Sequence, residues 1–481
     1  MKRLGSRGQF AVLAIIMLVA IFFRTFRLGT VPGGLTDDEA LWGFQATRVA
    51  NGEIRPIFFE EKFGREPMYG YLVAALFKLF GPSILALRMT SVLVGIATVP
   101  MFYLFAKMLF AESKGPQGPM AVTAVLATSW LATSYWHVIY SRAGFEPVLL
   151  PFFAVVTFYF LWRAIKSGQL AFFLCAGLFL GASVYTYRAG RFLPIFVFLF
   201  LLYVAWKDRQ FLSSQWRNTL FLFITCFLVV TPLIVYGLSH PEVFLRRDSA
   251  VSVFDAELSE GNPIAALGIG LLKTGMMFNL QGDPAPERNP GDRPVLDPLT
   301  SLCFIAGLAI AVTKSREREY AFVWLWLVAM CLPAALTILE IPNFSRAIGA
   351  LPALYIPPAI AVVEAYEFIK SRTTSARVRA MSASFLFGVP ILFAAATTYR
   401  DYFGAWAERE DLHRQFDVSL IEAANVMNQI DVARAVWIWP TTSLVSGQHV
   451  FSHPDFLYHG GAPYHYLSCL LYTSPSPRDR S

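Results

Sequence analysis

The chain has 481 residues, of which 56% belong to the set Ala, Val, Ile, Leu, Met, Phe, Trp, Tyr and Cys and only 15% are charged. A water-soluble domain carries about 25% charged residues. The composition therefore excludes a single water-soluble enzyme, and the 43 Phe, 19 Tyr and 11 Trp exclude a disordered or collagen-like chain. The net charge of +7 does not by itself indicate nucleic acid, because basic residues in membrane proteins first report topology.

Eleven apolar segments have the composition of membrane spans, which need about 20 mostly apolar residues. They lie near residues 9–23, 84–110, 120–138, 147–162, 170–187, 192–206, 218–238, 298–313, 320–339, 347–368 and 381–399. Segments 67–80 and 264–280 are interrupted by Lys and Gly, and we expect them to lie in the outer interface. The sequence therefore predicts an all-α polytopic membrane protein with about 11 to 13 transmembrane helices.

Basic residues set the expected orientation. A cytoplasmic N-terminus gives inner loops with sixteen Lys and Arg residues, as the positive-inside rule requires. These loops are residues 1–8, 111–119, 163–169, 207–217, 314–319 and 369–380. We therefore expect a multi-pass protein of the cell membrane whose large loops, 24–83 and 239–297, lie on the external or periplasmic face.

The layout predicts a membrane domain over residues 1–399 and an external C-terminal α/β domain over 400–469. We expect a helix near 408–430 and a strand at 435–439 in the second domain. Residues 470–481 (LLYTSPSPRDRS) change composition abruptly and resemble translated sequencing adapter. We set them apart as a non-native tail and expect the external domain to be truncated.

Carboxylates open the first external loop. Asp37, Asp38 and Glu39 are consecutive, and acids beside a membrane are costly unless they are solvated, paired or used. Thr36 and Glu39 have the spacing of a capping box, and acids in a first helical turn complement the helix dipole. Capping and function are compatible, because a helical turn holds a carboxylate in a fixed direction.

The same loop closes with Arg65, Glu66 and Tyr69 on either side of Pro67. This charged turn leads into an aromatic, apolar segment, which is also what a solvated loop meeting an interfacial helix looks like. However, a loop of about sixty residues with carboxylates at both ends is unusual for a plain connector. We therefore treat these residues as candidates for substrate binding.

Arginines stand at the expected outer ends of spans that are distant in sequence. They are Arg142, Arg188, Arg191 and Arg346. A single arginine there is often a side chain that reaches the headgroup level. Several of them on the side that carries the acids indicate a site that neutralises phosphate, which Arg binds in a bidentate manner.

Over residues 5–400 the layout resembles the GT-C superfamily of integral-membrane glycosyltransferases, in the branch of the protein O-mannosyltransferases and lipid A aminoarabinose transferases. The resemblance is carried by the short first span, the Asp38-Glu39 opening, the Glu66-Pro67 turn, the Ser141-Arg142 turn and the Arg346 turn before Pro352. It implies a polyprenyl-phosphate-linked sugar donor, an inverting transfer on the external face and an Asp-Glu pair in the catalytic loop. By position, Asp38 matches the family aspartate and Glu39 its neighbour, while Asp37 is an additional acid.

The chemistry of such a transfer assigns expected roles. Inversion at an anomeric carbon needs a base that takes the acceptor proton, and Asp38 is the expected base. The departing phosphate gains charge, which the four arginines are expected to stabilise. A divalent ion held by Asp38 and Glu66 is an alternative source of positive charge, and no other cofactor is expected.

Other readings stay open at this stage. A transporter or flippase of lipid-linked glycans is the main alternative, although the spans carry few charges and show no internal repeat. A ligase that moves whole glycans would share the architecture. The acceptor is left open among lipid, glycan and protein, and no nucleic acid partner is expected. The spacing of His449, His453, His459 and His465 fits no zinc site.

Overall fold

The computed structural model describes residues 6–110, 120–429, 436–438, 456–457 and 464–466. The chain divides into two compact units, and each is described by itself. The first comprises Met1–Phe26, Pro56–Tyr69 and Arg88–Glu408. The second comprises Arg27–Arg55, Gly70–Leu87 and Arg409–Ser481.

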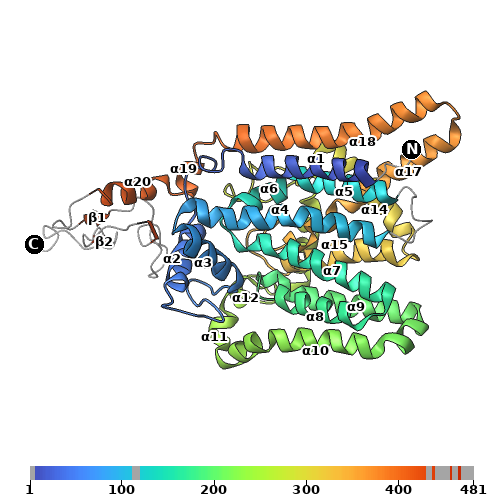
Figure 1. Ribbon diagram of the computed structural model, residues 1–481. Helices are drawn as coiled ribbons and strands as arrows, with labels where there is room; N and C mark the ends of the chain where they lie inside the picture. The colour runs from blue at the N-terminus through green and yellow to red at the C-terminus, as the bar shows by residue number, and fades with distance from the viewer. Residues whose placement is uncertain (1–5, 111–119, 430–435, 439–455, 458–463, 467–481) are drawn as a thin grey trace, which may run out of the picture. The chain divides into compact units, whose positions relative to one another are not determined.

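Long helices that run side by side build the first unit (Figure 1). Its first half contains α1 (Ser6–Thr25), α4 (Ile84–Leu109), α5 (Met120–Thr133), α6 (Tyr135–Arg142), η1 (Glu146–Val148), α7 (Leu149–Ser167), α8 (Leu170–Ser183), η2 (Arg188–Arg191), α9 (Phe192–Lys207) and α10 (Arg209–Ser239). Its second half contains α11 (Pro241–Phe244), α12 (Arg246–Val251), α13 (Pro263–Met276), α14 (Pro298–Thr313), α15 (Arg318–Ala335), η3 (Ile348–Ala350), α16 (Leu351–Leu354), α17 (Ile356–Arg372), α18 (Ala376–Tyr399) and the π-helix η4 (Arg400–Trp406).

Seven helical segments of the described chain are long and apolar enough to cross a membrane. They are Gly8–Thr25, Ile84–Leu109, Glu146–Ser167, Arg188–Lys207, Ser213–Ser239, Ile348–Arg372 and Ala376–Trp406. Five shorter apolar helices accompany them, and each of the eleven expected spans coincides with one or more helices. The polytopic all-α fold class is therefore confirmed, whereas the number of spans and their orientation stay predictions.

Aromatic rings fill the centre of the first unit. Phe322 and Trp326 of α15 meet Phe158 of α7 edge to face, with ring centroids 4.9 and 4.7 Å apart. Phe200 of α9 approaches Phe322 in the same way at 4.8 Å. Because helices in lipid gain little from the hydrophobic effect on association, such close packing is what holds three distant helices together.

Glycines allow other helix pairs to approach more closely still. A Cβ added at Gly307 of α14 would lie 1.8 Å from the carbonyl oxygen of Pro357 in α17. Gly177 of α8 faces the Leu222 carbonyl of α10, and Gly270 of α13 faces the Ala335 carbonyl of α15, each at 2.3 Å. Small residues at these crossings let the two backbones touch.

The second unit holds α2 (Asp37–Ala50), most of α3 (Met68–Phe80), α19 (Leu412–Gln415), α20 (Val418–Met427) and two strands. The helix expected near 408–430 is divided into α19 and α20. The strand expected at 435–439 coincides with β1 (Val436–Ile438), which pairs in parallel with β2 (Tyr464–Tyr466). The expected non-native tail lies outside the described residues, and the predicted domain boundaries stay predictions.

The crossing of α14 and α17 generates a stability prediction. We expect Gly307→Ala to destabilise the protein by about 1 to 3 kcal/mol, because the new methyl group overlaps the Pro357 carbonyl. The matched control is Gly388→Ala in α18, where a Cβ meets nothing within 4 Å. Thermal unfolding in detergent should show a lower Tm for the first variant alone, and equal Tm values for both would contradict the prediction.

Candidate functional site

The three acids of the first loop form the first turn of α2. The expected capping box is present: the Glu39 amide donates to Thr36 Oγ1 at 3.2 Å, and the Thr36 amide donates to Glu39 Oε2 at 3.0 Å. Glu39 is buried, whereas Asp37 and Asp38 are half-buried. The cap therefore engages Glu39, and the role of Asp38 as a base stays a prediction.

A tight turn closes the same loop in the first unit. Phe59 and Arg65 exchange two backbone hydrogen bonds of 3.0 and 2.8 Å. Gly64 has a φ of +76°, and a Cβ there would lie 2.4 Å from the ring of Phe58, so the turn requires glycine. After the turn, Tyr69 shares a hydrogen bond of 2.9 Å with Ser91 of α4.

Glu66, Arg188, Arg191 and Asp248 form an ion-pair cluster, called here the η2 cluster. Arg191 bonds Glu66 at 2.9 Å and Asp248 at 3.0 Å, and Arg188 bonds the other Asp248 oxygen at 2.9 Å. Arg188 also donates to the carbonyl oxygens of Phe63 and Gly64, at 2.5 and 3.1 Å. The structure thus brings together three of the predicted residues and adds Asp248 of α12, which the sequence analysis missed.

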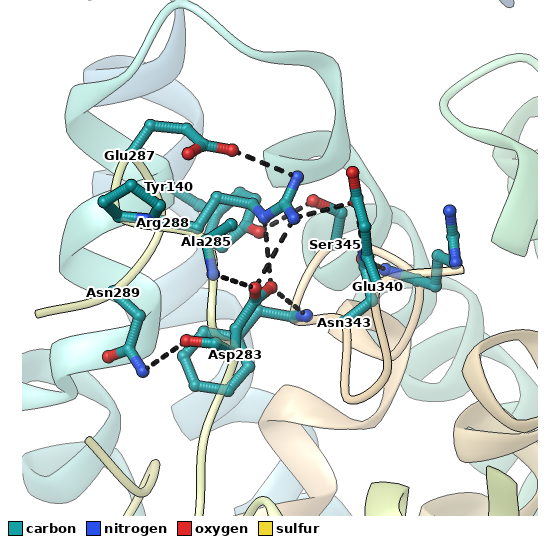
Figure 2. A network of polar contacts seen from close by, with 12 residues as sticks. Tyr140, Asp283, Ala285, Glu287, Arg288, Asn289, Glu340, Asn343 and Ser345 are labelled. Atoms are coloured by element: carbon teal, nitrogen blue, oxygen red, sulfur yellow. Dashed lines mark hydrogen bonds and ion pairs between the residues drawn. The ribbon is translucent and has the colours of Figure 1, made fainter. Parts of the chain in front are cut away.

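A second group, the Asp283 network, joins the long loop to the turn before η3 (Figure 2). The fully buried Asp283 carboxylate accepts the amides of Phe344 and Ala285, at 2.8 and 2.9 Å, and the Arg288 guanidinium at 3.0 Å. Arg288 also donates to Glu340 at 2.9 Å. The buried carboxylate therefore fixes the backbone two residues before Arg346.

Electrostatics in this network follow from burial and pairing. Burial alone would lower the pKa of Arg288, but the neighbouring carboxylates, above all Asp283, outweigh it and raise that pKa. Burial would raise the pKa of the Glu340 carboxyl, but the Arg288 guanidinium outweighs this effect and lowers it. Both groups are therefore held in their charged forms.

Arg346 lies next to the Asp283 network and is only 8% exposed. One of its terminal nitrogens donates to Thr337 Oγ1 at 2.7 Å and to the Leu339 carbonyl at 2.5 Å. Burial lowers the pKa of Arg346, and the guanidinium of Arg247 lowers it further, although Tyr187 and Glu340 oppose the shift. Two arginines of like charge thus stand near each other in a largely desolvated place.

These two guanidinium groups differ from the others in their partners. Among the residues that the structure describes, neither Arg247 nor Arg346 forms an ion pair with a carboxylate. The hydroxyl of Tyr187, which has both arginines as electrostatic neighbours, makes no hydrogen bond within the same ranges. Two guanidinium groups without a carboxylate partner in the described residues therefore have Tyr187 as a common electrostatic neighbour.

Arg142 lies elsewhere in the first unit. Its guanidinium is fully buried and donates to Tyr402 Oη and to the Phe23 carbonyl, both at 3.1 Å. It also lies over the rings of Tyr402 and Phe403, 5.1 and 5.0 Å from their centroids. These contacts of Arg142 thus link α1, α6 and η4.

The acids of α2 belong to the second unit, and the predicted arginines, Arg65, Glu66 and Tyr69 belong to the first. The role of each remains a prediction. In the described ranges, no three His, Cys, Asp or Glu side chains converge as they would around a metal ion. Arg247, Asp248 and Tyr187 were missed, and the only sequence signal for the first two was the run Arg246-Arg247-Asp248 just after α10.

Comparisons with known proteins place the fold. ArnT from Cupriavidus metallidurans, bound to undecaprenyl phosphate, superposes with a TM-score of 0.57 at 12% identity, over 95% of this chain and 85% of that one. The archaeal oligosaccharyltransferase AglB from Archaeoglobus fulgidus, in complex with an inhibitory peptide and a dolichol-phosphate, gives 0.56 at 15% identity, over 89% and 58%. The chain has the GT-C fold.

A further structural match of this GT-C protein is the arabinofuranosyltransferase AftD from Mycobacteria, with a TM-score of 0.50 at 16% identity over 97% of this chain and 32% of that one. Residues 64–236 match the family described as dolichyl-phosphate-mannose-protein mannosyltransferase. No curated protein sequence matches. The predicted resemblance is confirmed at the level of the fold, and the family matched by residues 64–236 is one of glycosyltransferases, in agreement with the predicted enzyme class.

The Asp283 network yields a prediction about folding. We expect Asp283→Asn to cost about 3 to 5 kcal/mol, because it leaves the Arg288 cation in a largely buried place with one partner fewer. The control is Asp292→Asn on the same loop, where the side chain is exposed and the φ of 59° suits Asn. Thermal unfolding should separate the two variants by several degrees, and a control as unstable as Asp283→Asn would refute this account.

Proposed function

We propose that the protein transfers a sugar from a polyprenyl-phosphate-linked donor to an acceptor hydroxyl, with inversion, on the external face of the membrane. The observation that carries the proposal is the pair of arginines without carboxylate partners, Arg247 and Arg346, beside the Tyr187 hydroxyl. Proteins of the same fold have been captured with undecaprenyl phosphate and with a dolichol-phosphate. The acceptor is a lipid, a glycan or a protein.

A phosphate group satisfies the electrostatics around Tyr187. The buried Arg346 is unfavourable without an ion-pair partner, and the half-buried Arg247 beside it adds repulsion between like charges. A phosphate that bridges Arg247 and Arg346 reduces both penalties, as the singly charged phosphodiester of the donor and more strongly as the released polyprenyl phosphate, and it accepts hydrogen bonds in the planar geometry that guanidinium groups offer. The Tyr187 hydroxyl supplies a further donor.

The same groups favour the reaction over simple binding. As the bond between the anomeric carbon and the phosphate oxygen breaks, negative charge accumulates on the phosphate. Cations fixed beforehand at that place stabilise the transition state more than the ground state. Arg142, Arg188 and Arg191 already bond protein acceptors, and in this proposal they shape the site around the phosphate.

Asp38 is the proposed base. The acceptor oxygen attacks the anomeric carbon from the face opposite the phosphate, and its proton passes to the Asp38 carboxylate. Asp38 suits this role better than Glu39, because the capping box already engages the Glu39 carboxylate. A divalent ion held by Asp38 and Glu66 is the alternative source of charge stabilisation, and chelation of metals during the assay tests it.

The base assignment can be tested with radiolabelled polyprenyl-phosphate sugars in lipid nanodiscs. We expect Asp38→Asn to lower kcat by about two to four orders of magnitude, the usual contribution of a general base, with little change in donor binding. The control is Asp37→Asn, an adjacent acid of similar burial. Sugar transfer by Asp38→Asn at the rate of the wild type would rule this base out.

The phosphate site makes a separate prediction about binding. We expect Arg247→Gln to weaken the binding of undecaprenyl phosphate roughly 10- to 100-fold, because a charge-assisted interaction of about 1.5 to 3 kcal/mol is lost. Arg246→Gln is the matched control, since Arg246 is exposed and neighbours Arg247 on the same helix. Titration of the labelled lipid into purified protein measures both Kd values, and an equal loss in both variants would contradict the assignment.

A further inference from the structure

We propose that Asp248 is a positioning residue, which anchors α12 to η2 and thereby presents Arg247 to the phosphate. The inference rests on the proposed function and adds a residue to its site. It reassigns Arg188 and Arg191 from ligands of the phosphate to supports of a third arginine.

Ion pairs, and not buried side chains, connect α12 to η2. This helix has six residues, and neither α11 nor α12 buries a single residue. A helix of this length is not stable by itself, and it has no apolar face that could fix its position. Asp248 makes both ion pairs of the helix and ties it to η2, while the carbonyl of Val251, at the end of α12, accepts the Ile338 amide at 2.9 Å.

Further contacts of α12 involve its first two residues. Arg246 donates to the Lys62 carbonyl at 3.3 Å, and the Arg247 guanidinium lies 5.6 Å from the centroid of the Phe63 ring. Both partners belong to the turn whose carbonyls bind Arg188. The Asp248 ion pairs thus hold the helix against a surface that these contacts only supplement.

The segment that holds α12, η2, is itself tightly packed. A Cβ at Gly190 would lie 2.3 Å from the Ser183 carbonyl, so η2 packs directly on the end of α8. Arg191 is tied to Glu66, whose side chain is 2% exposed, and its guanidinium lies 4.2 Å from the centroid of the Phe244 ring. An anchor on η2 therefore transmits a fixed geometry to α12.

Arg247 and Asp248 lie on different faces of α12. Adjacent residues on a helix do not share a face, because each residue turns the helix by about 100°. Asp248 is directed at η2, whereas the Arg247 guanidinium lies over the Phe63 ring, with Tyr187, Glu340 and Arg346 among its electrostatic neighbours. One side chain of α12 holds the helix and the next one supplies the cation.

The two arginines of η2 differ from Arg247 in how many hydrogen-bond donors they already use. Both terminal nitrogens of Arg188 and both of Arg191 already donate to oxygens of the protein. A phosphate that bound these terminal nitrogens would compete with Asp248, Glu66 or a backbone carbonyl, whereas the buried Arg191 Nε has no hydrogen-bond partner among the described residues. In the described ranges, Arg247 makes no hydrogen bond that a phosphate would have to break.

The test uses the full chain in nanodiscs, with labelled undecaprenyl phosphate as the probe. We expect Asp248→Asn to raise the Kd on the order of tenfold, a usual strength of coupling between neighbouring groups, and Asp248→Glu to recover most of the affinity. The control is Glu242→Gln on α11, an exposed carboxylate that forms no ion pair within the described residues. Its Kd should equal that of the wild type.

A double variant separates positioning from a general loss of structure. If Asp248 acts through Arg247, the effect of Asp248→Asn disappears in a chain that already carries Arg247→Gln. Additive effects, an unchanged Kd or tighter binding by Asp248→Asn would each overturn the inference. Tighter binding in particular would mean that Asp248 competes with the phosphate.

Failure of the proposed function gives a different pattern. In that case the wild type does not bind undecaprenyl phosphate at all. Hydrogen exchange of residues 240–252 then still reports on the anchor, because faster exchange in Asp248→Asn than in Glu242→Gln shows that Asp248 holds α12. Equal exchange in the two variants would overturn the anchor itself.

Discussion

An arginine that leaves water needs an acceptor for its charge, and the polar turns of the first unit are organised around this requirement. Arg288 meets it with Asp283 and Glu340, and Arg191 meets it with Glu66 and Asp248. Each pairing joins segments far apart in the sequence, so the counter-charges also fix the loops in space. Arg247 and Arg346, two electrostatic neighbours of Tyr187, form no ion pair with a carboxylate in the described residues, and there the proposed substrate supplies the partner.

The membrane fold could be predicted because it depends on a property that every span carries by itself. The run at 298–313 is apolar over its whole length, and α14 has these same bounds. The capping box of Thr36 and Glu39 was predictable for a similar reason, since both partners lie within one helical turn. Such local signals need no knowledge of what packs against them.

The arginines show where prediction from sequence ends. Arg142, Arg191 and Arg346 all stand at ends of apolar segments, and the pattern gives them one common role. Their partners distinguish them, and these lie 260, 125 and 9 residues away for Tyr402, Glu66 and Thr337. No spacing rule connects such positions. For the same reason, the sequence did not identify Asp248 and Arg247 as site residues, because they lie among other charged residues of a long loop.

The Asp283 network has a consequence for how this protein can diversify. Because Asp283 accepts the Phe344 amide, the residues around Asp283 and the turn before η3 form one rigid piece. Between this piece and α12 lie residues 252–262, most of which are exposed. Substitutions at the exposed positions of that segment touch neither polar cluster, so its surface can change in sequence while the charged framework is kept.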